Sequence, residues 1–389
     1  MLAIRAASLF DGAGAALVPD QLVLVEGGRI VAVRSGDDVP ASARLVDLGA
    51  ATLVPGLIDA HVHLAFDASA DPVGRLATVD DQELLDGMRD AARRALAAGV
   101  TTVRDLGDRG YLAVRLRDEL AADPGAGATV LAAGPPITMT RGHCWFLGGE
   151  ADGVDGVRAA VREHAERGVD VIKVMATGGD LTPGTSVHEP SYGLAELRAA
   201  VEEARRLGLP TTAHAHGTRG IANAAEAGFD MVEHCTFRTT DGARADDAVI
   251  EAILRSGLVV SATLGAVPGH PSPPRVAAMV PRFVEVFRRL RAAGVPVIYS
   301  SDAGIGPPKP HDVLPYSAAM MVNLNGYPTV EALRAVTSAA AAACGLGERK
   351  GRIAAGYDAD LLAVGGDPLA DIDALREVRA VFRAGHRVR

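Results

Sequence analysis

The sequence contains few cysteines. Its 389 residues include only Cys144, Cys235 and Cys344. An odd and sparse set of this kind does not form a disulfide framework and suits a reducing compartment. We therefore expect a cytoplasmic protein whose fold does not depend on disulfide bonds.

Long apolar and long basic segments are also missing. No stretch approaches the roughly eighteen apolar residues of a membrane span, and the N-terminus MLAIRAASLFDG lacks the apolar core of a signal peptide. The net charge is −9, and no run of Lys or Arg is long enough to follow a phosphate backbone. These absences argue against membrane and nucleic-acid partners, whereas a homo-oligomer is compatible with the sequence.

Several catalytic motifs are absent too. The sequence has no HExxH, GxSxG or GxxxxGK[ST] motif and no GxGxxG after a strand, which excludes the usual zincin, serine hydrolase and nucleotide-binding patterns. Cys144 and Cys235 each follow a His. Because neighbouring residues on a strand point to opposite faces, we expect neither thiol to be a nucleophile.

The two ends of the chain resemble each other in pattern. Residues 21–25 and 29–33 are strand-like segments joined by a glycine turn, and residues 360–364 and 378–382 repeat the arrangement near the C-terminus. We predict that residues 1–54 and 349–389 pack together as one discontinuous β-sandwich domain.

The middle of the chain, residues 55–348, alternates strand and helix. Apolar segments predict strands at 56–63, 101–106, 129–133, 171–176, 210–216, 231–234, 258–263 and 295–301. Segments rich in Ala, Leu, Glu and Arg predict helices at 82–98, 154–167, 194–207, 245–256, 277–293 and 328–345. Several end in a glycine just before the next strand, as left-handed helix caps do. Eight strand–helix pairs predict an α/β fold, a (β/α)8 TIM-like barrel, whose chemistry lies at the C-terminal strand ends.

Two strands carry polar residues in an apolar setting. His61 and His63 end the first strand and share a face, so they could hold one metal ion or could simply be polar residues at a strand exit. Lys173 lies inside the apolar strand 171–176. It either reaches solvent or a carboxylate, or it is desolvated and neutral, in which case it could add carbon dioxide and bridge two cations as a carbamate.

Three later strands also end in side chains of the ligand type. His214 and His216 end the fifth strand, His234 ends the sixth and Asp302 ends the eighth. Taken separately, each histidine could be a hydrogen-bonded structural residue, and Asp302 could cap a turn. With Lys173 included, chance would have to place such residues on five separate strands, so together they favour a metal site.

The expected metal ligands are His61, His63, Lys173, His214, His234 and Asp302. Imidazole and carboxylate donors suit zinc best, with manganese, iron or cobalt as alternatives. Two such ions could activate a water molecule for attack on a carbonyl carbon. Asp302 could also take a proton from that water and deliver it to a leaving amine.

With these residues in place, the chain resembles the amidohydrolase superfamily. The HxH of the first strand, the lysine in IKVMATGG, and the HAH, EHC and SSDAG segments follow that family's order over essentially the whole chain. Within the superfamily it is similar to the imidazolonepropionase-like group, which includes prolidases and carboxypeptidase-like dipeptidases. The resemblance implies a binuclear metal centre with a carboxylated Lys173, and hydrolysis of an amide or peptide bond beside a free carboxylate.

The resemblance also suggests substrate contacts. His143 matches a substrate-contacting histidine and could stabilise an oxyanion, but the surrounding loop, RGHCWF, departs from the Gly-Gly-His-Gly of many relatives. Arg141 in that loop could bind a substrate carboxylate, or it could be a solvated loop residue. His216 stands where some prolidase-like relatives have Tyr, and Tyr192 follows the fourth strand. Both are further candidates for contact with substrate.

Three functions are compatible with these residues. The first is a binuclear metallohydrolase that cleaves a dipeptide or an N-acyl amino acid, both small-molecule substrates. The second is a hydrolase of a cyclic amide, or a deaminase, although deaminases of this superfamily usually use one metal and lack the bridging lysine. The third is a non-catalytic interaction protein, which the complete ligand set disfavours. Lys309 and His311 follow the last strand and could also face the site.

Overall fold

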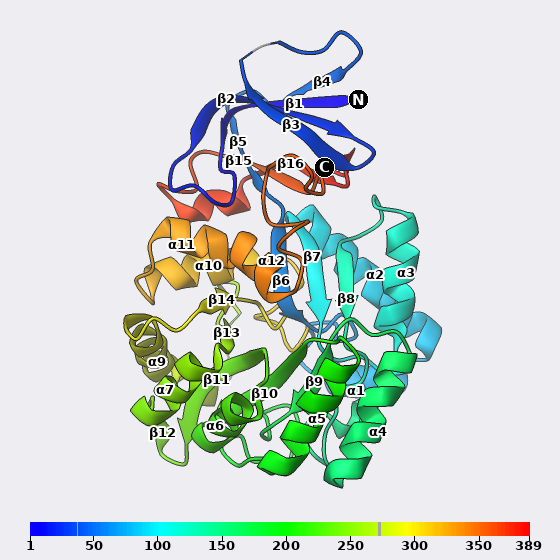
Figure 1. Cartoon of the computed structure of the whole chain (residues 1–389), viewed down its shortest axis with the longest axis vertical. Helices are drawn as coiled ribbons and strands as arrows, with labels where there is room; N and C mark the ends of the chain where they lie inside the picture. The colour runs from blue at the N-terminus through cyan, green and yellow to red at the C-terminus, as the bar shows by residue number, and fades with distance from the viewer. Residues whose placement is uncertain (37, 271–273) are drawn as a thin grey trace.

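The computed structural model describes residues 1–36, 38–270 and 274–389. Strands from both ends of the chain gather at one end of the molecule, above a larger α/β portion that holds most of the helices (Figure 1). Both termini lie in this terminal β region. Within the described part of the chain, no helix combines the length and the apolar character needed to cross a membrane.

The chain ends form a single sheet of eight strands. They are β1 (Leu2–Leu9), β2 (Val18–Glu26), β3 (Arg29–Ser35), β4 (Arg44–Asp47), β5 (Ala51–Pro55), β15 (Leu361–Gly365), β16 (Val378–Arg383) and β17 (His386–Arg387). The order is β17-β16-β15-β5-β1-β2-β3, and β4 also pairs with β1. β5 pairs with β15 along its whole length, which confirms that the two chain ends meet.

The boundary between the two portions is short. β5 ends at Pro55, and the first strand of the α/β portion, β6 (Leu57–Val62), begins two residues later. Arg383 of β16 donates hydrogen bonds to the carbonyls of Leu120 and Gly127 in the α/β portion, at 2.9 and 2.7 Å. The division into two domains, and a sandwich rather than one sheet at the chain ends, stay predictions.

The α/β portion contains the eight predicted strands. They are β6, β7 (Val100–Asp105), β8 (Thr129–Ala132), β9 (Ile172–Met175), β10 (Thr211–Gly217), β11 (Met231–Thr239), β13 (Val259–Ala262) and β14 (Val297–Tyr299). A short β12 (Gly242–Ala243) pairs with the end of β11. The eight strands run parallel in two groups, β6-β7-β8 and β9-β10-β11-β13-β14.

Isolated backbone bridges link these two groups at both edges. On one side, Ile137 bridges to Val174 of β9 just beyond β8. On the other side, Val62 of β6 bridges to Ala303 just beyond β14, and the Asp302 amide donates to the His61 carbonyl at 2.8 Å. The structure thus confirms an α/β fold of parallel strands whose two groups contact each other at each end.

Helices cover the outside of these strands (Figure 1). They are α1 (Pro72–Thr78), α2 (Asp81–Ala97), α3 (Leu112–Ala122), α4 (Gly153–Glu166), α5 (Leu194–Arg206), α6 (Thr218–Ala227), α7 (Asp247–Ser256), α8 (Pro274–Ala277), α9 (Val280–Ala292), α10 (Leu314–Asn323), α11 (Thr329–Ala335) and α12 (Ser338–Ala343). The six predicted helices do not include α1, α3, α6 or α10, and only Ala277 of α8 falls within the predicted helix 277–293. None of α3, α6 and α10 has a side-chain N-cap hydrogen bond, so the usual start signal is missing.

The predicted helix 328–345 is wrong in one respect, because it is broken into α11 and α12. The Val336 carbonyl between them accepts a hydrogen bond from the Ile58 amide of β6 at 2.8 Å. The Thr337 hydroxyl turns back to the Leu333 carbonyl at 2.6 Å. The break therefore ties the last helical segment to the first strand of the α/β portion.

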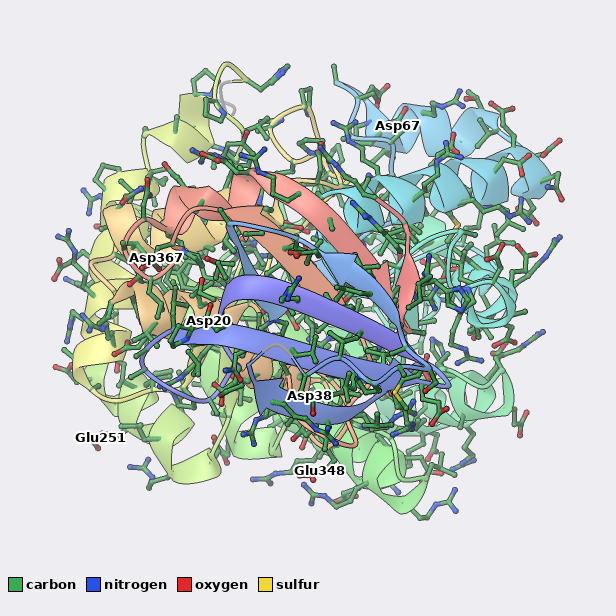
Figure 2. The ribbon with its side chains drawn as sticks, turned by 90° about the horizontal axis from the view of Figure 1, so that it is seen from above. Asp20, Asp38, Asp67, Glu251, Glu348 and Asp367 are labelled. Atoms are coloured by element: carbon green, nitrogen blue, oxygen red, sulfur yellow. The ribbon has the colours of Figure 1, made fainter. Side chains whose placement is uncertain are left out.

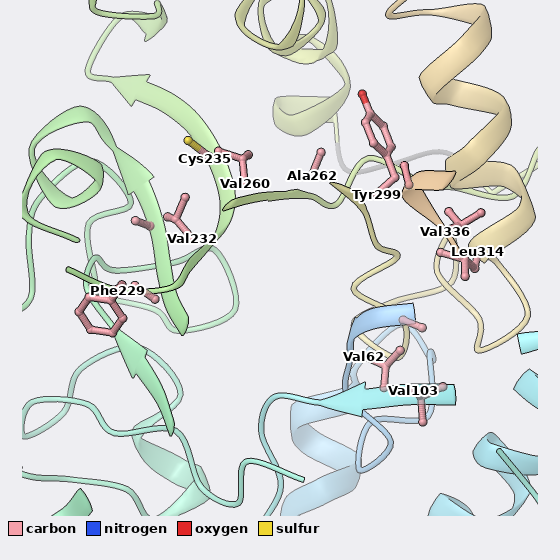
Figure 3. Packing of buried hydrophobic residues seen from close by; sticks show 14 of the residues in the cluster. Val62, Val103, Phe229, Val232, Cys235, Val260, Ala262, Tyr299, Leu314 and Val336 are labelled. Carbon is pink, nitrogen blue, oxygen red and sulfur yellow. The ribbon is translucent and has the colours of Figure 1, made fainter. Parts of the chain in front are cut away.

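Apolar side chains from the strands and the covering helices form one large core. Val62 and Val103 lie together on neighbouring strands, and Val232 and Val260 do so across β11 and β13 (Figure 3). Seen from above, the terminal sheet lies across the α/β portion, and Glu251 projects from the edge of the molecule (Figure 2).

Candidate metal centre

Three predicted ligands form a nearly equilateral triangle at the ends of β6 and β14. Nε2 of His61 lies 3.3 Å from Nε2 of His63, and Oδ1 of Asp302 lies 3.4 Å from each. Donor atoms about 2.0–2.2 Å from a tetrahedral ion are about 3.3–3.6 Å apart. The three atoms therefore have the spacing of three ligands of one metal ion, and all three side chains are buried.

Other hydrogen bonds fix the orientation of both histidines. Nδ1 of His61 lies 2.9 Å from Oε2 of Glu233, and Nδ1 of His63 lies 3.3 Å from the Gly107 carbonyl. When Nδ1 donates its hydrogen to such an acceptor, Nε2 keeps a lone pair for a metal. The surroundings thus select the ring nitrogen that faces Asp302.

A second group of histidines lies at the ends of β10 and β11. The donor atoms of His214, His216 and His234 are all within 4.8 Å of one another. Outer hydrogen bonds occupy Nε2 of His214, at 3.1 Å from the Gly178 carbonyl, and Nδ1 of His234, at 2.8 Å from the Thr263 hydroxyl. The opposite nitrogen of each ring remains for an ion.

His216 was expected to contact substrate. The structure instead places it within the second group of histidines. Its ring stacks on that of His234 with centroids 4.5 Å apart, and its Nδ1 lies 2.8 Å from the Thr236 hydroxyl. The alternation of side chains along β10 explains its position, because residues 214 and 216 share a face. A third imidazole donor is therefore present in the second group.

Lys173 is buried on β9, beside Thr212 of β10. Its Nζ has no hydrogen-bond partner in the described part of the chain. Burial lowers the pKa of the Lys173 amine to about 8, although Glu233 and Asp302 oppose that shift. Burial lowers the pKa of His61 in the first group and of His214 in the second, and the charge of Lys173 contributes to both shifts. An unpaired buried amine is costly, which is an argument for a modification or a ligand at this atom.

Nearby positive charge favours the ionised form of Asp302 and Glu233. Burial raises the pKa of Asp302, but His61, His63 and Lys309 outweigh burial and hold it well below its usual range. Glu233 behaves in the same way, because His61, Arg104 and Lys173 offset its burial. Two negative charges within a group of mostly neutral imidazoles form an environment suited to cations.

His143 lies against the second group. Its ring centroid is 4.6 Å from that of His214, and its Nδ1 is 3.0 Å from the Thr182 hydroxyl. The same Thr182 oxygen accepts the Cys144 amide at 2.9 Å, so its hydrogen is free for His143 Nδ1. This arrangement favours the tautomer with hydrogen on Nε2. Burial lowers the pKa of His143 to about 3, which keeps the ring neutral.

The glycines of the ATGG segment have a structural reason. A Cβ at Gly178 would lie 2.4 Å from the Ser186 carbonyl oxygen, so a side chain has no space there. A Cβ at Gly179 would lie 2.2 Å from Nε2 of His143, so only glycine leaves space for that ring. The sequence marked the ATGG segment only through its resemblance to a family motif. The contact of Gly179 with His143, thirty-six positions earlier, could not be predicted from the sequence.

Arg141 and Tyr192, the other predicted substrate contacts, have partners outside the two histidine groups. Arg141 is exposed, and its guanidinium lies over the Trp145 ring at 5.8 Å. Tyr192 is buried, and its hydroxyl donates a hydrogen bond to the Ala151 carbonyl at 2.6 Å. The Tyr192 hydroxyl therefore stabilises the fold. Substrate binding by either residue stays a prediction.

Lys309 and His311 support the backbone at the strand exits. Lys309 Nζ donates to the carbonyls of Thr263 and Ser301, at 2.7 and 2.6 Å. His311 Nε2 lies 3.1 Å from the His63 carbonyl. Both side chains therefore pack behind the ligands and hold the loops from which His63 and Asp302 project.

Two buried charged residues were missed by the sequence analysis. Glu233 accepts hydrogen bonds from Arg104 at 2.9 Å and Thr212 at 2.6 Å, in addition to His61. Arg238 pairs in register with Gly217, directly after His216, and donates to Asp180 at 2.6 Å. Both lie in β11, where "EHC" was recognised as a motif but only His234 was given a role.

The expectation for Cys144 needs a correction. It was expected to point away from His143, but its Sγ lies 3.6 Å from Nε2 of that ring. The two residues belong to a loop rather than a strand, and Cys144 has a left-handed backbone with φ 57°. Burial raises the pKa of its thiol to about 12, so the conclusion that it is no nucleophile is unchanged.

Comparison with known proteins gives a consistent result. A family model described as the amidohydrolase family matches residues 52–388. Ochratoxinase from Aspergillus niger is 29% identical over 370 residues, which cover 85% of this chain and 73% of that protein. Imidazolonepropionase from Chromobacterium violaceum is 28% identical over 384 residues, which cover 87% of this chain and 84% of that protein.

A solved structure agrees over nearly the whole chain. A crystal structure of a Xaa-Pro dipeptidase with bound methionine in the active site matches with a TM-score of 0.85 and 27% sequence identity, covering 99% of this chain and 98% of that one. The terminal sheet therefore belongs to the shared architecture as much as the α/β portion does.

Proposed function

Because this chain belongs to the amidohydrolase family and is a metal-dependent hydrolase of carbon–nitrogen bonds, we propose that it is a binuclear enzyme that cleaves a dipeptide or an N-acyl amino acid. The observation that carries the proposal is the pair of donor groups, His61–His63–Asp302 and His214–His216–His234, together with the buried and unpaired Lys173 amine on β9. One group would suffice for one ion, so two groups favour two.

The fold assigned to this function is a closed (β/α)8 barrel, residues 55–348, with the terminal β domain of residues 1–54 and 349–389. The bridges at Ile137 and Ala303 support closure, because they join the two groups of parallel strands at both edges. In a barrel the strand ends converge on one mouth, which explains why donors from β6, β9, β10, β11 and the end of β14 meet.

Lys173 is proposed to be N6-carboxylated. Its neutral amine would attack the carbon of carbon dioxide, forming the N–C bond and releasing one proton, so the buried amine becomes an anionic carbamate. Two carbamate oxygens could then face the two donor groups. Divalent cations held there, zinc best among them, would supply Lewis-acid activation of a water molecule and of the scissile carbonyl.

Two residues of the chain have defined tasks in the reaction. Ionised Asp302 accepts a proton from the attacking water and passes it to the departing amine nitrogen. The Nε2–H of neutral His143 donates a hydrogen bond to the carbonyl oxygen as it gains negative charge. The Thr182 hydroxyl favours this tautomer, and Gly179 leaves the ring its space.

The proposed substrate class rests on the similar proteins and on the arginine side chains near the site. The similar Xaa-Pro dipeptidase was crystallised with methionine, an amino acid, in its active site. Arg141 was the predicted partner of the substrate carboxylate, but Arg238 is better placed, being buried in β11 next to His216 on β10. A substrate carboxylate would compete with Asp180 for this guanidinium.

A cyclic amide is the second candidate, since an imidazolonepropionase is 28% identical over most of the chain. Deamination has no separate observation in its favour. The two candidates differ in the bond that must be cleaved, which a panel of linear and cyclic amides distinguishes.

We expect the metal-loaded enzyme to cleave dipeptides or N-acyl amino acids with a free carboxylate, and their C-terminal amides far more slowly. Arg238→Gln should raise KM for the free acid about 10- to 100-fold, because one charge-assisted contact is lost, and leave KM for the amide unchanged. Steady-state kinetics on paired substrates checks this. Arg255→Gln, an exposed arginine on α7, is the matched control.

Two outcomes of the same panel would contradict the proposal. Cleavage of lactams without cleavage of linear substrates would favour the cyclic-amide function. Equal rates for acids and amides, unchanged in Arg238→Gln, would show that no carboxylate is recognised at Arg238.

A further inference from the structure

The loop that carries His143 runs past both groups of metal ligands. The His143 ring lies against His214 of the second group, with centroids 4.6 Å apart. Leu147, later in the same loop, lies beside His63 of the first group, because a Cβ at Gly107 would be 3.3 Å from the His63 ring and 3.4 Å from Cδ1 of Leu147. This loop therefore forms one wall of the metal centre.

A row of aromatic rings leads from the first group to the surface of this loop. The Phe66 ring lies 5.5 Å from that of His63, the Phe146 ring 6.5 Å from that of Phe66, and the Trp145 ring 6.3 Å from that of Phe146, measured between centroids. Phe66 is buried, Phe146 is half-buried and Trp145 is 39% exposed. Aromatic rings at such spacings are in contact. The row thus joins a metal ligand to an exposed indole.

Exposed apolar side chains are concentrated in this loop. Met139 and Trp145 are both exposed, and they lie on either side of His143 in the sequence. Gly142 lets Met139 fold back onto the loop, because a Cβ at Gly142 would be 2.8 Å from Cγ of Met139. The Arg141 guanidinium covers part of the Trp145 ring, yet the indole stays accessible. A single exposed apolar residue is ordinary, whereas two beside a catalytic histidine indicate a surface for a ligand.

The backbone holds this loop in one conformation. Arg141 and Cys144 adopt left-handed backbones with φ 58° and 57°, a cost that non-glycine residues bear mainly at functional sites. The Arg141 amide donates to Glu150 at 2.6 Å, and the Cys144 amide donates to Thr182 at 2.9 Å. Trp145 is therefore presented in a fixed position, so little conformational entropy is lost when a ligand covers it.

The proposed function, on which this step rests, gives the direction of the substrate. In that proposal the carboxylate of the leaving amino acid pairs with Arg238 beside the second group, and His143 contacts the scissile carbonyl. The acyl part of the substrate then extends away from Arg238, over the first group. That direction leads to the wall formed by Phe146 and Trp145.

We propose that Trp145, with Phe146 behind it, forms the subsite for a large apolar or aromatic side chain on the acyl part of the substrate. Covering an exposed indole with an apolar group removes apolar surface from water on both partners. The substrate class narrows to dipeptides or N-acyl amino acids whose acyl part is apolar and bulky. Trp145 is then a residue that determines specificity and takes no part in the chemical step.

Phe-Gly and Gly-Phe test the proposal, because they carry the same ring on opposite sides of the cleaved bond. The metal-loaded enzyme should cleave Phe-Gly with a kcat/KM about 10- to 100-fold higher. Trp145→Ala should abolish this preference by raising KM for Phe-Gly, and should leave kcat/KM for Gly-Phe within about twofold. Trp145→Phe should keep most of the preference. Leu254→Ala, an exposed leucine on α7, is the matched control and should change neither value. N-phenylacetylglycine and N-acetylphenylalanine make the same comparison for N-acyl amino acids.

A binding measurement separates this inference from the proposed function. Trp145 is the only tryptophan of the chain, so its fluorescence reports on the subsite alone. In metal-loaded Asp302→Asn, which turns over slowly, Phe-Gly and N-phenylacetylglycine should shift the emission saturably, and N-acetylglycine should not. A shift without cleavage of any linear substrate by the native enzyme would overturn the proposed function but support the subsite. Equal kcat/KM for the two dipeptides, a preference that survives in Trp145→Ala, or an unchanged emission would overturn the subsite alone.

Discussion

Replacing Asp302 with Asn should lower kcat about 10³-fold or more, while most of the bound metal remains. The amide keeps an oxygen near Nε2 of His61 and of His63, which are 3.4 Å from Oδ1 of Asp302 in the native protein. It cannot accept the proton of the attacking water, and loss of a general acid–base group typically costs about 10²- to 10⁴-fold. Turnover of the best substrate and elemental analysis of the purified variant measure the two effects separately.

The control for this change is Asp118→Asn on the exposed face of α3, where the same chemical change should leave kcat within about twofold. Near-normal turnover in Asp302→Asn would remove Asp302 from the proton transfer. Complete loss of both metals would instead show that its main task is ligation.

Replacing Glu233 with Gln should have the largest effect on stability. The carboxylate is fully buried and accepts hydrogen bonds from His61, Arg104 and Thr212. The NH2 group introduced by the substitution would face at least one of the hydrogen-bond donors of His61, Arg104 and Thr212. The Arg104 charge would also lose its counterion. Breaking a buried ion pair in this way costs about 3–5 kcal/mol of unfolding free energy.

The same change should also weaken metal binding about 10- to 100-fold, because Glu233 orients His61. Urea unfolding of chelator-treated protein measures the stability loss without the contribution of metal, and a metal titration measures the affinity. Glu119→Gln, whose arginine partners are at the surface, should change the unfolding free energy by less than about 1 kcal/mol. Equal stability of Glu233→Gln and wild type would contradict the buried pair.

Local periodicity was enough to predict where the strands lie along the chain and most of the side chains that the structure brings into the two donor groups. His61 and His63, like His214 and His216, share a face by alternation along a strand. Glycines such as Gly99, Gly168 and Gly208, which adopt positive φ angles, marked the turns back to the sheet. These signals lie within a few residues of sequence and need no tertiary information.

Glu233 was missed because alternation fails at that point. On a regular strand, residues 233 and 234 would point to opposite faces. His234 has a left-handed backbone with φ 66°, and Cys235 follows with φ 49°. This turn lets Glu233 reach His61 while His234 joins His214 and His216. A change of this kind in a non-glycine residue has no sequence signal.

Contacts between distant segments could not be predicted either. Gly179 was visible only as part of a motif, and its reason is the ring of His143. Arg238 had no signal at all, since its position depends on the pairing of β10 with β11. The loop residue Arg141 was easier to notice because it precedes His143, yet its contact is with Trp145.

The central claim is that this chain holds two metal ions that share Lys173. Elemental analysis of the purified protein, reconstituted with zinc in the presence of bicarbonate and freed of loosely bound ions, tests it most directly. We expect two zinc ions per chain, one for each of the two histidine groups. A value of one per chain under saturating conditions would contradict the binuclear centre and the bridging role of Lys173.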